Sequence, residues 1–558
     1  MIPGRWTPLA VVALCGALTA GCKGDSKDTS PADADTDTDT DTDSDTDTDT
    51  DSDSDTDSDT APPRPCTDLT FELAQELDEE ALVGKGPFGD LPEEHGPGLA
   101  VGDLDGDGWL DGVVSVRGAG TVFLRNDGTG TWVVEPLVTL DGGAFPESSA
   151  VALADIDGDG DLDGAIGTPV GSPDIVFVNQ HAQGSSWTFT KKELPNSSVE
   201  HLTPTFADAN GDGRLDIFMG SYTHWFPPPG GLGDGVGLYF QDSNGDFTDE
   251  TSRIPFDDQW GLTFLGAWMD YDNDNDLDLF LVNDCHNAAD CAVSNLLLAN
   301  DGSGNFTRVE DCYCDDPIAG MGVGIGDPNL DGAPDMVVTN WGPPEYYINA
   351  KDGTFIKGTA AYNVVIEDPE TEVTWGALFT DLDLDGDVDL AINAGPPDLT
   401  PEQHPNISET QADPLLINDG TGTFDDMTAE IGIEERGIGR AWVRGDLDRD
   451  NKPELIAVGH IFVRVYEMTG GCEEGITLTL DGGTDFAHGI GSHVAVEAGG
   501  VSQSMWMLPA NTCSSSALEL YIGLGEASKA DLEITWIDGS TSTVEDVAAG
   551  TALTVTKD

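Results

Sequence analysis

Aspartates stand at alternate positions in the stretch DLDGDGWLD, residues 103–111. Numbered from its first residue, the stretch has carboxylates at positions 1, 3, 5 and 9 and glycines at positions 4 and 6. Alternate side chains of a tightly curled loop can converge on one point, and glycine permits the curl. Hard cations such as calcium take about six to eight oxygen ligands, which such carboxylates and a backbone carbonyl at position 7 would supply. The pattern therefore indicates a cation site.

Near-copies of this loop, here called loops two to seven, begin at Asp155, Asp208, Asp270, Asp327, Asp381 and Asp446. A single acidic loop is usually a solvated turn, but seven at one point of a repeat favour calcium. Carboxylates held close together repel unless a divalent ion lies among them, so we expect ion binding to stabilise the fold. We predict up to seven Ca²⁺ ions, one per loop.

The predicted ligands occupy positions 1, 3, 5, 7 and 9 of each loop. Position 3 is an asparagine in loops three and five, and loop seven ends in a glutamate beside two basic residues. The full set is Asp103, Asp105, Asp107, Trp109, Asp111, Asp155, Asp157, Asp159, Asp161, Asp163, Asp208, Asn210, Asp212, Arg214, Asp216, Asp270, Asp272, Asp274, Asp276, Asp278, Asp327, Asn329, Asp331, Ala333, Asp335, Asp381, Asp383, Asp385, Asp387, Asp389, Asp446, Asp448, Asp450, Lys452 and Glu454.

Successive loops begin 52, 53, 62, 57, 54 and 65 residues apart, the length of one four-stranded propeller blade. In each repeat an apolar stretch leads into the loop, and a buried-looking strand such as LFLV (279–282) follows it. An Asn-Asp-Gly turn and an aromatic-led strand come next, as in LLINDGTGTFDDM (415–427). The last repeat lacks its fourth strand, which TFELAQEL (70–77) resembles. We therefore predict an all-β, seven-bladed propeller over residues 66–470, with 66–80 closing the seventh blade.

Residues 471–558 leave the repeat and alternate apolar and polar positions in several strands, including ITLTL (476–480) and LEITWIDGS (532–540). This alternation predicts a small β-sandwich-like domain.

The loops, with an acid at position 9 and a strand directly after it, resemble the strand–loop–strand calcium sites of FG-GAP/VCBS propellers and of integrin α-subunits. They are not EF-hand loops, because position 12 is Val114, Ile166 or Met219 in the first three. Residues 489–539 resemble the ASPIC/UnbV domain, with Trp536–Gly539 in place of the usual Trp-Pro-Asp-Gly. The combination resembles the cartilage acidic protein family over residues 70–558. This resemblance implies calcium binding and extracellular interaction.

The N-terminal residues 1–21 are typical of an export signal, with Arg5 before the apolar stretch LAVVALCGALTA (9–20). The stretch LTAGC (18–22) resembles a bacterial lipobox, which implies lipidation of Cys22; an ordinary secretory signal is the alternative. Residues 22–65 form an Asp/Thr/Ser-rich segment that we expect to be a disordered tether. We therefore expect an exported protein, lipid-anchored at the bacterial outer membrane or cell surface.

The formal net charge of −83, from 105 acidic and 22 basic residues, argues against a nucleic-acid partner. No metalloprotease, nucleophile-elbow, P-loop or dinucleotide-binding motif occurs, so we predict a protein that is not an enzyme. We expect an adhesion or interaction scaffold for an extracellular protein or glycan, with Tyr222, Trp225 and Phe226 as ligand-binding candidates. The alternative is a secreted hydrolase or redox enzyme that uses the propeller channel.

Seven cysteines remain after Cys15 and Cys22, and an exported chain permits disulfides. We expect Cys312 and Cys314 to cross-pair with Cys285 and Cys291, because a bridge across one residue would be strained. A zinc site is the alternative for these four. Cys472 has two candidate partners, Cys66 and Cys513.

Overall fold

The computed structural model describes residues 69–557 outside a set of gaps. The gaps are 79–80, 83–97, 117–119, 137, 149, 170, 181–186, 198–200, 222–234, 256–261, 285–293, 367–371, 397–406, 408–410, 434–435, 460–461, 473, 484–486, 509 and 512–513. The predicted signal, tether and lipidation site at Cys22 lie outside the described residues, as do Tyr222, Trp225, Phe226, Cys66, Cys285, Cys291 and Cys513. Within the described part of the chain, no helix is long and apolar enough to cross a membrane.

Short antiparallel strands build most of the described chain. The first four-stranded unit consists of β2 (Gly98–Gly102), β3 (Asp111–Val116), β4 (Gly120–Asn126) and β5 (Trp132–Val134), each paired with the next. The same order recurs in β7 (Val151–Ala154), β8 (Asp163–Ile166), β9 (Ile175–Asn179), β10 (Thr188–Glu193); β11 (His201–Ala207), β12 (Asp216–Ser221), β13 (Gly237–Gln241), β14 (Phe247–Asp249); β15 (Leu262–Met269), β16 (Asp278–Asp284), β17 (Leu296–Ala299), β18 (Thr307–Arg308); β19 (Gly320–Gly326), β20 (Asp335–Asn340), β21 (Gly342–Asn349), β22 (Phe355–Lys357); β23 (Thr374–Thr380), β24 (Asp389–Ala394), β26 (Leu415–Asn418), β27 (Phe424–Asp426); and β29 (Gly439–Gly445), β30 (Glu454–Gly459), β31 (Phe462–Met468).

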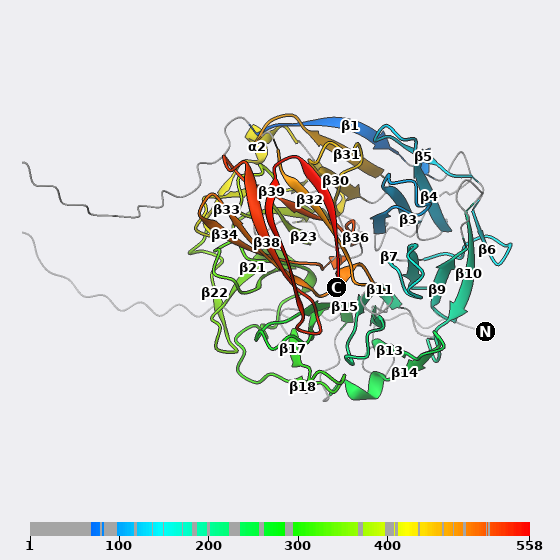
Figure 1. The fold of residues 1–558 in the computed structure, drawn as a ribbon. Helices are drawn as coiled ribbons and strands as arrows, with labels where there is room; N and C mark the ends of the chain where they lie inside the picture. Colours follow the sequence, from blue (N-terminus) through cyan, green and yellow to red (C-terminus); the bar gives the residue numbers. More distant parts are fainter. Residues whose placement is uncertain are drawn as a thin grey trace, which may run out of the picture. The chain divides into compact units, whose positions relative to one another are not determined.

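The four-stranded units form a closed ring. Their innermost strands contact one another in chain order from β2 through β7, β11, β15, β19 and β23 to β29, and β29 contacts β2 again. The prediction of an all-β propeller is therefore confirmed (Figure 1). The last unit takes its outer strand from the other end of the chain, because β1 (Phe71–Leu77) pairs antiparallel with β31. Arg464 holds this pairing from the side, with its guanidinium 2.8 Å from the Glu76 carboxylate. The edge of β31 is thus covered.

Burial explains why the strands differ in composition. Every residue of β7 and of β12 is buried, as expected where neighbouring sheets cover both faces of a strand. In the outer strands β5, β22 and β27 only the leading aromatic residue is buried. These aromatic rings fill the space between sheets: Phe424 of β27 lies edge-on to Tyr346 of β21, with ring centroids 6.2 Å apart. The aromatic-led fourth strand is therefore a packing device of the propeller.

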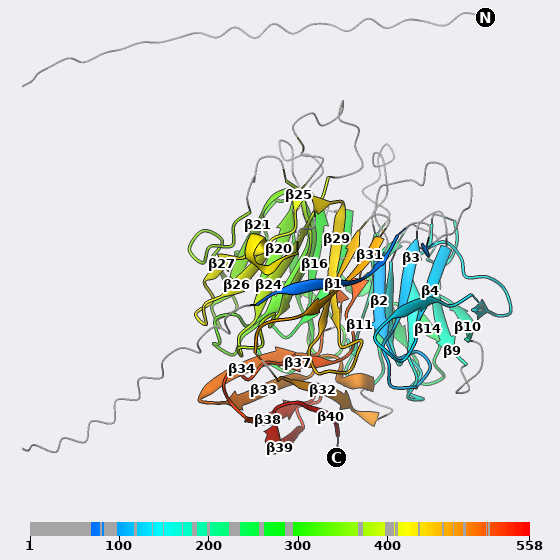
Figure 2. The same ribbon diagram turned by 90° about the horizontal axis from the view of Figure 1, so that it is seen from above.

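Two sheets make up the C-terminal domain. One is ordered β37 (Leu520–Ile522), β32 (Ile476–Asp481), β40 (Thr551–Thr556); the other is ordered β34 (Val501–Trp506), β33 (His493–Ala498), β38 (Lys529–Thr535), β39 (Thr541–Ala548). Alternate residues of these strands, such as Leu478, Val496 and Ile534, share one buried cluster. Figure 2 shows these strands as a layer against one side of the propeller. The β-sandwich-like prediction is confirmed.

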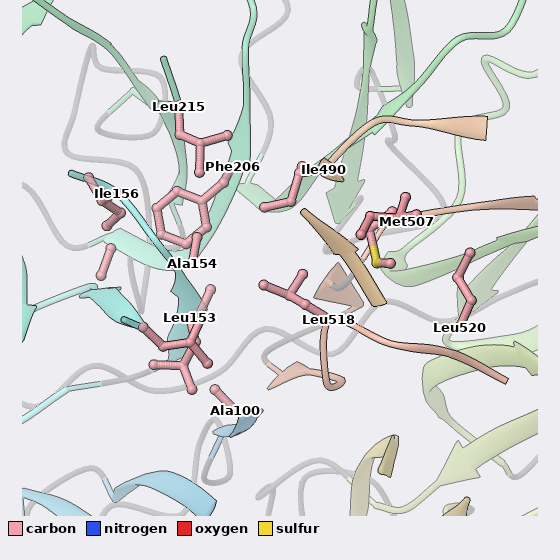
Figure 3. Close-up of a cluster of buried hydrophobic side chains, with 14 of the residues drawn as sticks. Ala100, Leu153, Ala154, Ile156, Phe206, Leu215, Ile490, Met507, Leu518 and Leu520 are labelled. Carbon is pink, nitrogen blue, oxygen red and sulfur yellow. The ribbon is translucent and has the colours of Figure 1, made fainter. Parts of the chain in front are cut away.

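A segment of the C-terminal domain enters the propeller ring. Its short strands β35 (Ala510–Asn511) and β36 (Ser514–Ser515) pair with each other, and β36 pairs in parallel with the innermost strand β2. The two strands also contact β7, β19, β23 and β29, so they lie at the centre of the ring. The flanking side chains Met507 and Leu518 share a hydrophobic cluster with Leu153 and Phe206 of the propeller (Figure 3). The domain is therefore joined to the propeller by a buried apolar contact.

The cysteine cross-pairing expected from the sequence is wrong for Cys312 and Cys314. These two residues are bridged to each other, with Cα atoms 5.3 Å apart, and both are fully buried. The intervening Tyr313 has a φ of 59°, a left-handed turn that brings its neighbours' side chains to the same side. Because their sulfurs are bonded, they cannot serve as zinc-binding thiolates. Cys472 is also disulfide-bonded, and both of its candidate partners lie outside the described residues.

Candidate metal centres

Each acidic loop connects the innermost strand of a blade to the second strand. Loop one, for example, runs from the end of β2 at Gly102 to Asp111, the first residue of β3. Since the four-stranded units of the described residues run in the same order around the ring, the fold places every loop at the same end of the propeller. The repeated spacing in the sequence therefore corresponds to a ring of equivalent loops.

Backbone amides hold the carboxylate at position 1. In loop one Asp103 accepts hydrogen bonds from the backbone N–H groups of Asp107 (3.2 Å) and Gly108 (2.8 Å). Loop four repeats the arrangement, with Asp270 accepting from Asp274 and Asn275, both at 3.0 Å. The first residues of loops two, three, five, six and seven bind the equivalent amides. The loop thus curls around its own first aspartate.

The acid at position 9 is the first residue of the second strand and is buried in every loop. Asp278 accepts hydrogen bonds from the N–H groups of Tyr271 (3.2 Å) and Asn300 (2.8 Å). Asp111 does the same with Leu104 (3.1 Å) and Asn126 (2.8 Å). This residue therefore ties its loop to the third strand of the same blade.

Positions 4 and 6 require left-handed backbone. In loop one these are Gly106 and Gly108, with φ of 67° and 91°. The same positive φ occurs where the sequence departs from glycine, at Asn273 and Asn275 of loop four and at Leu384 of loop six. The curl is thus a property of all seven loops and does not depend on glycine alone. A leucine at positive φ is strained, so loop five with Leu330 and loop six with Leu384 are held in shape by their surroundings.

In five loops the carboxylates converge. Three side chains in each have oxygen atoms within 4.8 Å of one another: Asp103, Asp105 and Asp111; Asp155, Asp157 and Asp163; Asp270, Asp272 and Asp278; Asp381, Asp383 and Asp385; and Asp446, Asp448 and Asp450. In loops three and five the asparagine at position 3 turns its amide nitrogen toward the acid at position 9, with Asn210 3.0 Å from Asp216 and Asn329 2.8 Å from Asp335. Those amides would have to rotate to offer oxygen to a cation.

Position 7 is an aspartate in loops two, four and six and another residue in the remaining loops. In those remaining loops its backbone N–H donates to the carboxylate at position 5. The N–H nitrogen of Trp109, for example, lies 2.9 Å from a carboxylate oxygen of Asp107, and Arg214, Ala333 and Lys452 donate in the same way. Where position 7 is itself an aspartate, side-chain oxygens are buried without a hydrogen-bond partner, in Asp161, Asp276 and Asp387. Unpaired buried carboxylate oxygens are costly, which makes these three loops the most in need of a cation.

Basic side chains lie beside loops one, three and five. Arg125 pairs with Asp105 of loop one, and Arg214 pairs with Asp212 of loop three. Lys351 lies 3.3 Å from Asp331 of loop five. These cations neutralise part of the negative charge that an ion would otherwise meet. Loops two, four and six are consequently the strongest candidates among the described loops.

Burial raises the pKa of the acids at position 9. The pKa is about 8 for Asp111, Asp163, Asp216 and Asp335 and about 9 for Asp278, against an ordinary value of 3.8. Backbone hydrogen bonds oppose the shift, but loss of solvent dominates it. Without a cation these acids keep a proton near neutral pH. The site is thus built so that either protons or a divalent ion must compensate its charge.

A ring of amide side chains, missed in the sequence and open between loops six and seven among the described residues, links neighbouring loops. Asn300, at the end of the third strand of blade four, donates to the backbone oxygens of Leu277 (3.0 Å) in its own loop and of Ala209 (2.8 Å) in the preceding loop. The same link to the preceding loop is made by Asn126, Asn179, Gln241, Asn349 and Asn418. The sequence does contain a sign of this link, the Asn that recurs at the start of the Asn-Asp-Gly turns. That Asn was interpreted only as a hairpin residue, so its contact with the preceding loop was not predicted.

Comparison with known proteins assigns both parts of the chain. Residues 93–165 and 327–392 match the family described as FG-GAP-like repeat, and residues 482–558 match ASPIC and UnbV. The chain carries FG-GAP-like repeats and a C-terminal ASPIC/UnbV domain. Loops one, two, five and six lie inside the matched FG-GAP-like stretches. Together the two matches indicate a β-propeller protein of the extracellular type. No curated protein matches the chain.

Several solved structures resemble the chain at low identity. A lectin of Agrocybe aegerita that recognises non-reducing terminal N-acetylglucosamine is 18% identical, covering 63% of this chain and 84% of its own, with a TM-score of 0.40. Saccharomyces cerevisiae Sqt1 is 11% identical over 73% of this chain and 100% of its own, with a TM-score of 0.38. BBS1N in complex with ARL6DN is 8% identical over 72% and 98%, with a TM-score of 0.40. These likenesses concern the fold alone.

Proposed function

We propose that the protein is a calcium-binding scaffold, exported and lipid-anchored through Cys22, that holds a protein or glycan ligand at the cell surface. One observation carries the calcium assignment: seven loops share a geometry in which backbone amides fix the first and last carboxylates. In three of those loops the aspartate at position 7 has buried oxygen without a hydrogen-bond partner, and in loop one the same holds for one oxygen of Asp105. Calcium suits such a set because it takes carboxylate and carbonyl oxygens in flexible geometry.

The role of the ions in this proposal is structural. The loops are joined to one another by the amide ring from Asn126 to Asn418, so each ion would stabilise its own blade and the contact to the next. Calcium binds the folded chain and not the unfolded one, which raises the free energy of unfolding. Thermal denaturation with calcium and with EGTA tests the proposal directly. An identical melting temperature under both conditions would refute it.

The ligand face is proposed to lie opposite the calcium loops. The connections between second and third strands emerge there, and three are long: residues 222–236, 285–295 and 395–414. Binding residues are commonly found on long loops carried by a rigid scaffold. The test is a screen of the calcium-loaded protein against glycan and protein arrays. For any ligand found, Trp225→Ala should weaken binding, whereas the matched variant Trp109→Ala, in acidic loop one at the opposite end of the propeller, should not; equal affinities of the two variants would reject this face.

The alternative enzyme has less structural support. Strands β35 and β36 lie at the centre of the ring, and the cavity left beside them, lined by Arg444, Trp506 and Leu520, has a volume of about 80 Å³. Sites for small molecules usually measure roughly 300–1,000 Å³. A panel of hydrolase substrates, assayed beside the array screen, separates the two functions. Turnover of a substrate in the absence of any array ligand would favour the enzyme.

A further inference from the structure

Loop six differs from the other strong candidates in being covered. Its five aspartates, Asp381, Asp383, Asp385, Asp387 and Asp389, are each at most 4% exposed. In loops two and four, by contrast, the aspartates at position 3, Asp157 and Asp272, are exposed to solvent. The cover over loop six comes from the C-terminal domain.

The covering segments are residues 471–472 and 520–525. The backbone N–H of Cys472 donates to the carbonyl of Asp383 (2.8 Å), and the N–H of Gly525 donates to the carbonyl of Leu384 (2.9 Å). The Gln503 amide donates to the carbonyl of Gly523 (2.9 Å) and so holds the second segment in place. Two peptide strands of the C-terminal domain are therefore hydrogen-bonded to the backbone of a single acidic loop.

Glycine makes this close approach possible. A Cβ atom on Gly523 would lie 1.9 Å from a carboxylate oxygen of Asp381 and 2.5 Å from the carbonyl carbon of Leu384. Contacts of that length do not occur between non-bonded atoms, so any side chain at residue 523 would displace the segment or the loop. The Asp381 carboxylate is thus closed off from solvent by the glycine backbone.

The covered loop has little charge compensation: the buried guanidinium of Arg444 lies near Asp381 without forming an ion pair, and it is one positive charge against five carboxylates. Both carboxylate oxygens of Asp387, which is 2% exposed, have no hydrogen-bond partner. No ion pair among the described residues includes any of the five aspartates. Buried carboxylates without a counter-charge are strongly unfavourable, and a divalent ion among them supplies that charge.

We propose that the loop-six ion is an interdomain clamp: an occluded Ca²⁺ whose binding is coupled to the docking of residues 520–525 on the propeller. The inference rests on the calcium function proposed above. A coupling free energy is reciprocal. Loss of the ion therefore weakens the docking of residues 520–525, and poorer docking of residues 520–525 lowers the affinity of loop six for calcium. The cover also makes this ion slower to leave than those in the open loops.

The test compares two isosteric variants at position 9, which is acidic in all seven loops: Asp389→Asn in the covered loop and Asp163→Asn in the open loop two. Bound calcium is counted by mass spectrometry of the metal, and amide hydrogen exchange is followed at residues 520–525. Each variant should bind one ion fewer than the wild type. Only Asp389→Asn should accelerate exchange at Gly523 and Gly525, by at least about tenfold.

The outcomes separate this clamp from the broader function. If both variants lose an ion and exchange at residues 520–525 is the same in both, the clamp is wrong and calcium binding stands. If the wild type holds no calcium, the proposed function fails and the clamp fails with it. Should Asp389→Asn not fold, Gly523→Ala keeps every acid and should speed the release of one ion into EGTA by about tenfold; unchanged release overturns the clamp.

Discussion

The variant Asp278→Asn in loop four shows whether protonation or a bound calcium ion compensates the charge of this buried acid, because the two cases predict different losses in the free energy of unfolding. Burial raises the pKa of Asp278 to about 9, so at neutral pH without calcium the side chain is a neutral acid. An amide is similar in size and charge to that acid. In EGTA the substitution should therefore cost only about 1 kcal/mol, the net worth of one altered hydrogen bond to Tyr271 or Asn300.

With calcium present the same variant should be clearly weaker than the wild type. An ion at a concentration near 100 times its Kd adds about 2.7 kcal/mol to the free energy of unfolding, and a site that has lost one charged ligand forgoes most of that gain. The difference between wild type and variant should thus grow from about 1 to about 3–4 kcal/mol when calcium replaces EGTA.

The assay is thermal and urea denaturation followed by circular dichroism, in calcium and in EGTA. Asp425→Asn, which makes the same charge change at an exposed residue of β27, is the matched control and should behave like the wild type in both. If Asp278→Asn destabilises the protein equally with and without calcium, loop four does not exchange protons for an ion, and the reasoning is refuted.

Three further predictions concern pH, the amide ring and the closing strand. The pKa of Asp163 is raised from 3.8 to about 8, so the proton that the folded state holds stabilises the apo protein at low pH and that stability is lost as pH rises through 8; melting temperature in EGTA should fall between about pH 5 and about pH 9 and should be flatter in calcium, and an opposite slope would contradict this. Asn300→Ala removes two donors to buried carbonyls and should cost about 2–4 kcal/mol in urea denaturation, whereas exposed Asn244→Ala should cost under about 1; equal costs would reject the ring as a blade-to-blade link. Deleting Phe71–Leu77 uncovers β31 and should give dimers or aggregates in light scattering; a stable monomer would contradict the closing role of β1.

The fold was predictable because two simple patterns repeat. The loop spacing and the aromatic-led fourth strands define a blade, and Phe71 heads a segment of the same type that occupies the missing position beside β31. The entry of β35 and β36 into the ring was not predictable. That segment is short and has no apolar periodicity, and its place is set by hydrogen bonds such as that from the N–H of Leu99 to the Ser514 hydroxyl, 415 residues apart.

The candidate site was predictable in part. The acids at positions 1, 3 and 9 follow from the ligand chemistry of calcium and from the alternation of side chains in a curled loop. The basic neighbours Arg125 and Lys351 were missed because they come from other strands, at positions that the loop spacing does not constrain. The cover over loop six was missed for the same reason: Gly523 and Gly525 are far away in sequence, and only the packing of two domains brings them there.

The measurement closest to the central claim is the number of calcium ions that the purified protein retains. We expect equilibrium dialysis followed by metal mass spectrometry to find at least the three ions of loops two, four and six, and up to seven when calcium is in excess. Replacing the position-9 acids Asp163, Asp278 and Asp389 by asparagine should remove those three. A wild-type protein with less than one bound ion per chain, or a triple variant that retains the full number, would contradict the assignment of these loops as calcium sites.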